Sequence, residues 1–184
     1  MKKAFVHFAE GFEEIEAITI VDVLRRADIQ TLMVSVSGRK EVTGAHNIRI
    51  AADALFEEAD YSEAEIMILP GGMPGSKNLN AHLGLKDQLL SFDKSKKRIA
   101  AICAAPLVLG GLHILEGHEA ACYPGYEDKL LGADLKYEPA LVSGNIITSR
   151  GPGTAMDFSL TIVAELKGES TADELARALL SQTW

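Results

Sequence analysis

The segment of residues 98–106, which reads RIAAICAAP, constrains the fold of this chain more than any other. A short apolar run ends at Cys103, and small residues and an apolar helical pattern follow at once. A buried strand that turns abruptly into a helix leaves the residue at the turn facing accessible space and the first free N–H groups of the helix. Because those groups and the helix dipole favour an anion, we expect the Cys103 thiol to ionise more easily than a free cysteine. A buried structural cysteine is the alternative interpretation of this segment.

Length and composition describe an ordinary globular protein. The 184 residues are 47% hydrophobic and 24% charged, which fits one domain over residues 1–184 with a substantial core. The net charge of −8, with no basic cluster longer than residues 94–98, argues against nucleic acid or an anionic membrane surface as a partner. No segment approaches the ~18 apolar residues of a membrane span. Two cysteines make no disulfide framework, so we expect a protein of the reducing cytoplasm.

Strand and helix patterns alternate along the chain. Short apolar runs predict strands at residues 4–9, 30–37, 65–69, 98–102 and 120–122, and a hairpin of 141–142 with 146–149. Short β-pieces around Gly44, within residues 41–55, are expected to form a small hairpin outside the main sheet. Helical periodicity predicts helices at residues 12–27, 83–92, 105–112, 154–166 and 172–180. A capping box of Thr171 and Glu174 is expected to begin the last helix.

This alternation predicts an α/β fold, in which a mostly parallel sheet is covered by helices on both faces. Ligands of such sheets bind outside the carboxyl ends of the strands. Gly11, the pair Gly71 and Gly72, and Cys103 each follow a predicted strand at that edge. Their convergence favours a functional role for Cys103 over a structural one.

Glu16 is the predicted partner of the thiol. At about 100° per residue it lies near the centre of an apolar stripe of the helix 12–27. Burial of a carboxyl group there is expected to raise its pKa, so that the protonated acid donates a hydrogen bond to a thiolate or an oxidised cysteine. The alternative is that Glu16 only stabilises the first helical turn. Ile15, Ile18 and Val21 lie away from this stripe and favour a dimer contact.

Several other residues are candidates for binding. Consecutive glycines adopt backbone conformations closed to other residues, so the N–H groups of Gly71 and Gly72, with that of Ala104, are candidates for an oxyanion pocket. A tight turn without a function is the alternative. The turn of residues 150–154 leads into a helix whose free N–H groups are suited to an anion.

Cys122 is interpreted as a filler cysteine. The histidines show no metal-ligand spacing and no dinucleotide fingerprint is present, so neither metal nor cofactor is expected.

Four motifs, at residues 11–16, 69–72, 102–106 and 148–154, resemble in the same order those of the ThiJ/PfpI superfamily. The chain is most similar to the branch that contains the Parkinson-disease-linked protein deglycase and its bacterial relatives. The resemblance covers nearly the whole chain. It implies a flavodoxin-like three-layer sandwich, a homodimer without a cofactor, and an easily oxidised nucleophile at Cys103. Glu16 would be the protonated acid in contact with it, and Gly72 and Ala104 would line the pocket.

The resemblance also implies the chemistry. Members of this branch are assigned conversion of methylglyoxal or glyoxal to the hydroxy acid, repair of glycated molecules, redox sensing and chaperone-like protection. Two positions depart from related patterns. The human-type branch has a histidine in a Thr-His-Pro segment, where this chain has Tyr123. The protease and amidotransferase branches place histidine directly after the cysteine, where this chain has Ala104, so peptide or glutamine hydrolysis is not expected.

Overall fold

A seven-stranded sheet forms the centre of the protein, and the computed structural model describes residues 2–181. The strands lie in the order β10, β11, β7, β6, β1, β2, β5, and all neighbours are parallel except β10 and β11. Their bounds are β1 Lys3–Phe8, β2 Gln30–Ser35, β5 Ala54–Leu55, β6 Ile66–Leu69, β7 Arg98–Ile102, β10 Ala140–Ser143 and β11 Ile146–Ser149. Two short pairs lie outside this sheet: β3 (Glu41–Thr43) antiparallel to β4 (Arg49–Ala51), and β8 (Glu119–Ala120) parallel to β9 (Asp134–Leu135).

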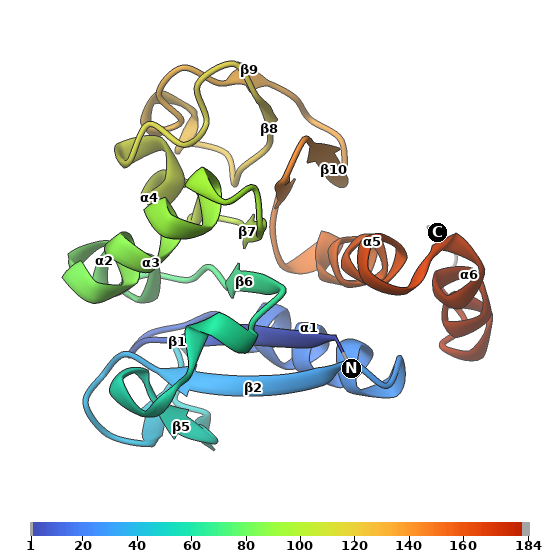
Figure 1. Ribbon diagram of the computed structural model, residues 1–184, viewed down its shortest axis with the longest axis horizontal. Coiled ribbons are helices and arrows are strands. Elements are labelled where there is room, and N and C mark those ends of the chain that lie inside the picture. The colour runs from blue at the N-terminus through green and yellow to red at the C-terminus, as the bar shows by residue number, and fades with distance from the viewer. Residues whose placement is uncertain (1, 182–184) are drawn as a thin grey trace.

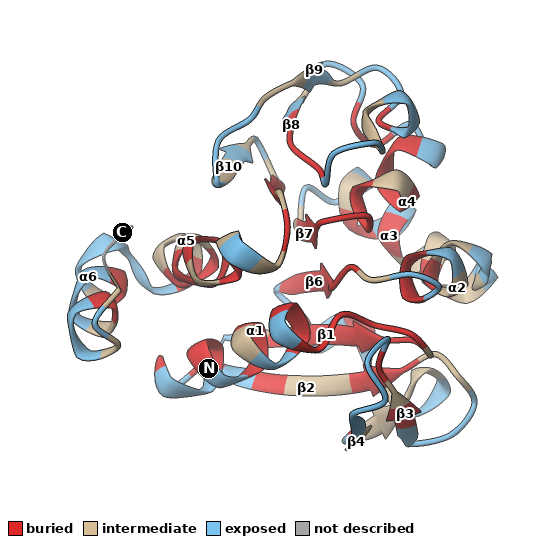
Figure 2. Ribbon diagram, turned by 180° about the vertical axis from the view of Figure 1, so that it is seen from behind, coloured by how far each residue is buried: buried red, intermediate tan, exposed pale blue. Residues whose placement is uncertain are grey.

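Helices cover both faces of the sheet (Figure 1). One face carries α1 (Glu14–Arg26), α5 (Ala155–Lys167) and α6 (Glu169–Ala178), and the other carries α2 (Gly75–Ala81), α3 (Leu83–Lys94) and α4 (Pro106–Gly111). Side chains alternate between the two faces along each strand. Val6 therefore packs in the core beneath α1 and α5, and its neighbour Phe5 packs in the core beneath α2, α3 and α4. Figure 2 shows β1 and β6 as buried, whereas much of α6 is exposed. None of the helices in residues 2–181 has the length and apolar character needed to cross a membrane.

This architecture confirms the predicted flavodoxin-like α/β fold. The strand-to-helix passage from β7 to α4 lies where the sequence predicts it, and the two predicted hairpins are β3 with β4 and β10 with β11. The predicted strand at residues 120–122 is the two-residue β8, which pairs with β9 instead of joining the main sheet.

Three local features differ from the sequence prediction. Helix α2 is missed, because Gly75–Ala81 holds mostly small and polar residues and has no apolar period. Within residues 41–55, β5 pairs with β2 and so extends the main sheet. The capping box at Thr171 is wrong: Gly168, with φ of 95°, ends α5, and α6 begins directly after it. The Thr171 hydroxyl therefore lies inside the helix and donates to the Lys167 carbonyl at 3.3 Å.

Candidate functional site

Cys103 lies at the sharp turn between β7 and α4. Its φ is 65°, a left-handed conformation that is uncommon for any residue except glycine and is typical of strained functional turns. The backbone is held on both sides, because Cys103 N–H donates to the Ser149 carbonyl at 3.0 Å and its carbonyl accepts from Tyr123 N–H at 2.8 Å. The residue is 8% exposed. The sheet edge thus holds the sulfur in a fixed and nearly buried position.

Glu16 points from α1 towards this turn and is fully buried. Its Oε2 accepts a hydrogen bond from the N–H of Gly71 at 2.8 Å. Its Oε1 has no hydrogen-bond partner in the described structure. The helix is capped by Glu13 instead, whose carboxylate accepts from the N–H of Ile15 at 3.3 Å. A role limited to the helix turn therefore does not account for Glu16.

Gly71 and Gly72 allow the three segments to meet. A Cβ atom on Gly71 would lie 2.5 Å from Cys103 Cβ and 2.7 Å from Glu16 Oε2, so only glycine leaves room between them. Gly72 has φ of 91°, and its N–H and that of Ala104 act on the Cys103 thiol by lowering its pKa. Because the N–H of Gly71 already serves Glu16, Gly72 and Ala104 are the donors left for the sulfur.

Burial raises the pKa of both acids of this pair. The pKa of Glu16 rises to about 7, chiefly through burial, although the Gly71 N–H and the Cys103 side chain act in the opposite direction. The pKa of Cys103 rises to about 12, first through burial and then through the charge and hydrogen bond of Glu16, against the N–H groups of Gly72 and Ala104. The prediction that the Cys103 thiol ionises more easily than a free cysteine is therefore wrong, because its pKa is raised. Because the side chains of Glu16 and Cys103 interact, the two groups titrate as a pair, and once the first proton is lost they share the remaining proton and one negative charge.

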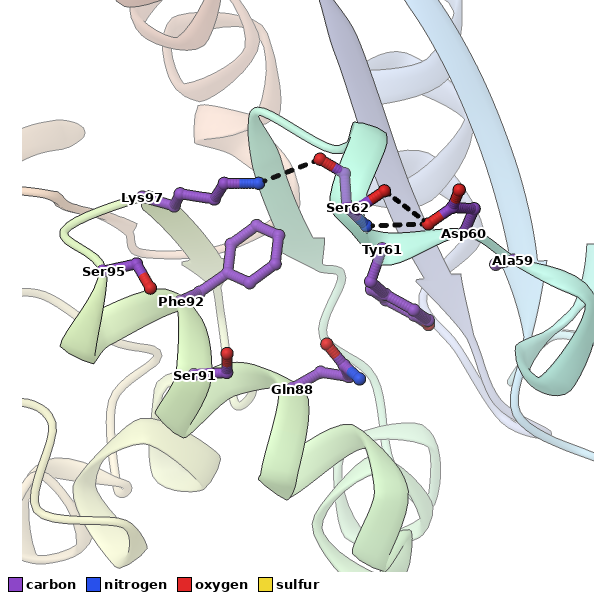
Figure 3. A pocket seen from close by; sticks show the side chains of 9 residues that line it. All are labelled: Ala59, Asp60, Tyr61, Ser62, Gln88, Ser91, Phe92, Ser95 and Lys97. Atoms are coloured by element: carbon purple, nitrogen blue, oxygen red, sulfur yellow. Dashed lines mark hydrogen bonds between the residues drawn. The ribbon is translucent and has the colours of Figure 1, made fainter.

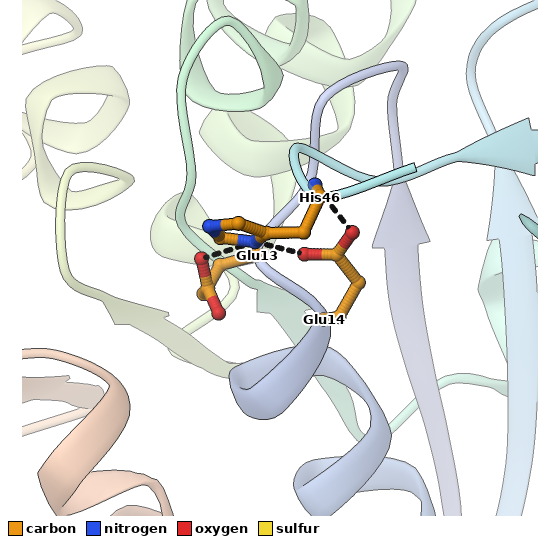
Figure 4. Close-up of side chains that lie close together, drawn as sticks. All are labelled: Glu13, Glu14 and His46. Atoms are coloured by element: carbon orange, nitrogen blue, oxygen red, sulfur yellow. Dashed lines mark hydrogen bonds and ion pairs between the residues drawn. The ribbon is translucent and has the colours of Figure 1, made fainter. Parts of the chain in front are cut away.

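A second group of titratable residues lies on the other side of the first turn of α1. The imidazole Nδ1 of His46 lies 2.7 Å from Glu14 Oε2 and 3.7 Å from Glu13 Oε2 (Figure 4). Glu14 is 5% exposed, and its Oε1 accepts from the N–H of His46 at 2.6 Å and of Ile48 at 3.4 Å. These contacts tie α1 to the turn between β3 and β4. The histidine spacing gives no sign of this cluster, because the fold brings His46 to the helix from a distant segment.

A polar cavity of about 360 Å³ lies at the opposite end of the sheet, where β6 and β7 begin (Figure 3). Tyr61 forms part of its lining, and its hydroxyl donates a 3.0 Å hydrogen bond to Nε2 of the fully buried His7, whose Nδ1–H donates to the Ile68 carbonyl. Burial lowers the pKa of His7 to about 4, so this histidine is neutral in the folded protein. Since Cys103 follows the carboxyl end of β7, the cavity is not part of the cysteine site.

The segment around Cys122 touches the site through its backbone. Cys122 is 6% exposed within the core beneath α2–α4, and its thiol pKa is raised to about 11, chiefly by burial. Tyr123 follows Cys122 in the same segment. Its N–H contacts the Cys103 carbonyl, and its side chain is 46% exposed. No sequence signal marks this backbone contact.

Comparisons with known proteins agree with this architecture. Residues 2–165 match the DJ-1/PfpI family. The chain is 38% identical to the Parkinson disease protein 7 homolog of Danio rerio over 97% of both chains, and 35% identical to the glutathione-independent glyoxalase DJR-1.2 of Caenorhabditis elegans over 92% of this chain and 91% of that protein. Oxidized Toxoplasma gondii DJ-1 superimposes with a TM-score of 0.94 at 33% identity, covering 99% of this chain and all of that one. Two Arabidopsis thaliana relatives are longer, and the chain spans 41% and 46% of their length.

Proposed function

Because this chain belongs to the DJ-1/PfpI family, we propose that it is a cofactor-independent enzyme that converts 2-oxoaldehydes to 2-hydroxy acids. One observation carries the proposal: the Cys103 sulfur is held between the buried acid of Glu16 and the N–H groups of Gly72 and Ala104. The relative named a glutathione-independent glyoxalase supports the same activity. The pair supplies a nucleophile and a proton carrier next to each other, which is what this reaction needs.

The proposed reaction begins with the microstate in which Glu16 holds the shared proton and Cys103 is a thiolate. The sulfur adds to the aldehyde carbon, and the oxygen takes the proton, which gives a hemithioacetal. Glu16, now ionised, removes the proton from that carbon and returns it to the neighbouring carbonyl carbon through an enediol, which gives a thioester. Water hydrolyses the thioester, releases the 2-hydroxy acid and restores the thiol. One carbon is oxidised and its neighbour reduced, so no external redox partner is required.

The turnover test compares lactate formation from methylglyoxal in four proteins. Wild type is expected to turn over, whereas Cys103→Ser and Glu16→Ala are expected to lose at least about a hundredfold in kcat/KM. Cys122→Ser is the matched control, because it removes the other buried thiol and leaves the pair intact. Equal rates for wild type and Cys103→Ser would exclude a cysteine-dependent enzyme.

A redox-responsive protective role is the second candidate function. The buried Glu16 Oε1, which has no hydrogen-bond partner within residues 2–181, favours it, because a proton on that oxygen could be donated to an oxygen added to the sulfur. The similarity to an oxidized structure agrees with this role, and two free cysteines fit the expected reducing cytoplasm. Mass spectrometry after mild peroxide is expected to show oxygen on Cys103 before Cys122. Equal oxidation of the two would contradict this role.

We also propose that the protein acts as a homodimer through α1. Ile15 and Ile18 are 59% and 41% exposed on this helix, and Ile48 is 55% exposed on the turn that Glu14 ties to it. Such a group of exposed apolar side chains is suited to a second copy of the chain. Ile18→Glu is expected to sediment as a monomer and wild type as a dimer. A wild-type monomer at micromolar concentration would contradict the proposal.

A further inference from the structure

Arg150 differs from the five arginines that form ion pairs, because no carboxylate of residues 2–181 pairs with it. Five of the seven arginines pair with a carboxylate, namely Arg25, Arg26, Arg39, Arg49 and Arg98. Arg177 is exposed on the outer helix α6. Arg150 is half-buried, and its Nε is buried with no hydrogen-bond partner in residues 2–181. In a chain with 26 acidic residues, a partly buried guanidinium without an acceptor indicates a place for an anion from outside the chain.

The position of Arg150 is as informative as its missing partner. It follows β11, which lies parallel to β7, so it comes at the same edge of the sheet as Cys103. The preceding residue, Ser149, accepts the hydrogen bond of the Cys103 N–H at 3.0 Å. Arg150 is thus one residue away from a direct backbone contact with the nucleophile. Ligands of parallel sheets bind outside this edge.

Two aromatic rings border the same place. The Arg150 guanidinium carbon lies 5.6 Å from the centre of the Tyr137 ring, within the range of a cation–π contact. A Cβ atom on Gly151 would lie 3.0 Å from Tyr123 Cδ2, so this ring covers the adjacent backbone. Tyr137 and Tyr123 are 64% and 46% exposed, which leaves the border of this region open to solvent. The guanidinium thus contacts an aromatic ring, and within residues 2–181 no carboxylate forms an ion pair with it.

We propose that Arg150 binds the carboxylate of an anionic 2-oxoaldehyde whose aldehyde carbon is attacked by Cys103. The proposal rests on the proposed function and gives it a substrate class, 2-oxoaldehydes that carry a carboxylate. The planar guanidinium offers parallel N–H donors that match a carboxylate. Its Nε–H is buried and lacks an acceptor in residues 2–181, so the carboxylate would meet the terminal N–H groups. With 4,5-dioxopentanoate, the reaction adds one water, oxidises the aldehyde carbon to a carboxylate and reduces the neighbouring ketone to an alcohol. The product is 2-hydroxyglutarate.

The first arm of the test needs no turnover. It measures alkylation of Cys103 by the anion iodoacetate and by neutral iodoacetamide, in a Cys122→Ser background so that one buried thiol reacts. The alkylation ratio is the rate constant for iodoacetate divided by that for iodoacetamide. It is expected to be higher in the protein than in a cysteine peptide and to fall about tenfold in Arg150→Gln. Arg150→Lys keeps the charge without the fork, so an intermediate ratio is expected. Arg26→Gln, which removes the same charge from an exposed pair on α1, is the control and is expected to keep the ratio.

The second arm measures specificity with 4,5-dioxopentanoate and methylglyoxal. The ratio of kcat/KM for the anionic over the neutral substrate is expected to fall about tenfold in Arg150→Gln, mainly through KM for the anionic one. A wild-type alkylation ratio equal to that of the peptide would overturn the subsite without any variant. An alkylation ratio in folded Arg150→Gln equal to that of wild type would also overturn the subsite. If wild type shows no turnover and the alkylation ratio still depends on Arg150, the proposed enzyme fails and the anion subsite stands.

Discussion

Glu14 and Glu16 lie two residues apart on the first turn of α1, and both are buried, yet their pKa values move in opposite directions. Glu14 is 5% exposed and Glu16 is fully buried. Burial alone raises the pKa of both carboxyl groups. For Glu14, the hydrogen bonds from the side chain and backbone of His46 and from the N–H of Ile48 outweigh burial and lower the pKa. For Glu16, burial prevails and the pKa rises to about 7.

The number of donors and the depth of burial together separate the two carboxyl groups. Glu14 receives three hydrogen bonds, from two backbone N–H groups and one imidazole. Glu16 receives one backbone N–H, from Gly71, and interacts with the Cys103 side chain, and its Oε1 has no hydrogen-bond partner in residues 2–181. A fixed charge on Glu14 anchors the turn between β3 and β4 to the helix. A labile proton on Glu16 is available to Cys103. One helical turn therefore separates a structural acid from an acid suited to catalysis.

The largest expected effect is on turnover. Glu16→Gln keeps the size of the side chain and removes its proton exchange, so we expect kcat/KM for methylglyoxal to fall by about a thousandfold. Glu14→Gln, on the same turn, is expected to stay within about threefold of wild type. Lactate formation measures both. Equal losses in the two variants would show that the site responds to any change in this turn, and the contrast between the two acids would be lost.

A smaller effect is expected in the pH dependence of stability. The unfolded chain releases the Glu16 proton near pH 4.5, whereas the folded chain holds it up to about pH 7, according to the raised pKa. Stability from this group is therefore present at low pH and is lost as pH rises through this window. The unfolding free energy of wild type relative to Glu16→Gln is expected to fall by ~3 kcal/mol between about pH 4.5 and pH 7. Urea denaturation at a series of pH values checks this. A constant difference between the two proteins would mean that Glu16 is ionised in the fold.

The contrast also shows which parts of the molecule the sequence can predict. The turn at Cys103 depends on local features, an apolar run followed by small residues, and it is confirmed. The burial of Glu16 depends on helical period and is also confirmed. The prediction of a lowered pKa for the Cys103 thiol is wrong, because the pKa is raised. The sequence indicates the helix N-terminus but not how deeply the sulfur is buried beside a second acid. The roles of these residues stay predictions until turnover is measured.

The partners of Glu14 could not be predicted, for a physical reason. Periodicity detects burial by apolar neighbours, whereas Glu14 is buried by backbone N–H groups that arrive from residues 46 and 48. Those contacts exist only once β3 and β4 have paired and their turn has folded back on α1. That Arg150 Nε has no hydrogen-bond acceptor among residues 2–181 is likewise a property of the assembled fold. Absence of a partner leaves no trace in sequence.

The third expected effect, smaller than the pH-dependent change at Glu16, is a loss of stability when Glu14 no longer binds the turn between β3 and β4. Glu14→Ala leaves the N–H groups of His46 and Ile48 without their acceptor, so we expect a loss of ~2 kcal/mol in unfolding free energy. Glu14→Gln retains an acceptor oxygen for these N–H groups and is expected to lose less. Chemical denaturation at pH 7 compares the three proteins. If the alanine variant were as stable as wild type, the hydrogen bonds of Glu14 would contribute nothing to the unfolding free energy. The proposed anchoring of the turn by Glu14 would then be contradicted.

The smallest expected effect belongs to His46, whose imidazole is mostly exposed. The hydrogen bond and charge of Glu14 raise the pKa of His46, so its charged form is favoured in the fold. A raised histidine pKa gives stability that is present below its unfolded value of 6.5 and is lost as pH rises through the folded value. Wild type is therefore expected to have a higher urea midpoint than His46→Gln at pH 6, and the difference is expected to vanish by pH 9. The same substitution in a Glu14→Gln background is expected to have no pH-dependent effect, because the carboxylate that holds the proton is gone. A pH-dependent difference that persists in that background would assign the shift to Glu13, the other acid within reach of the ring at 3.7 Å.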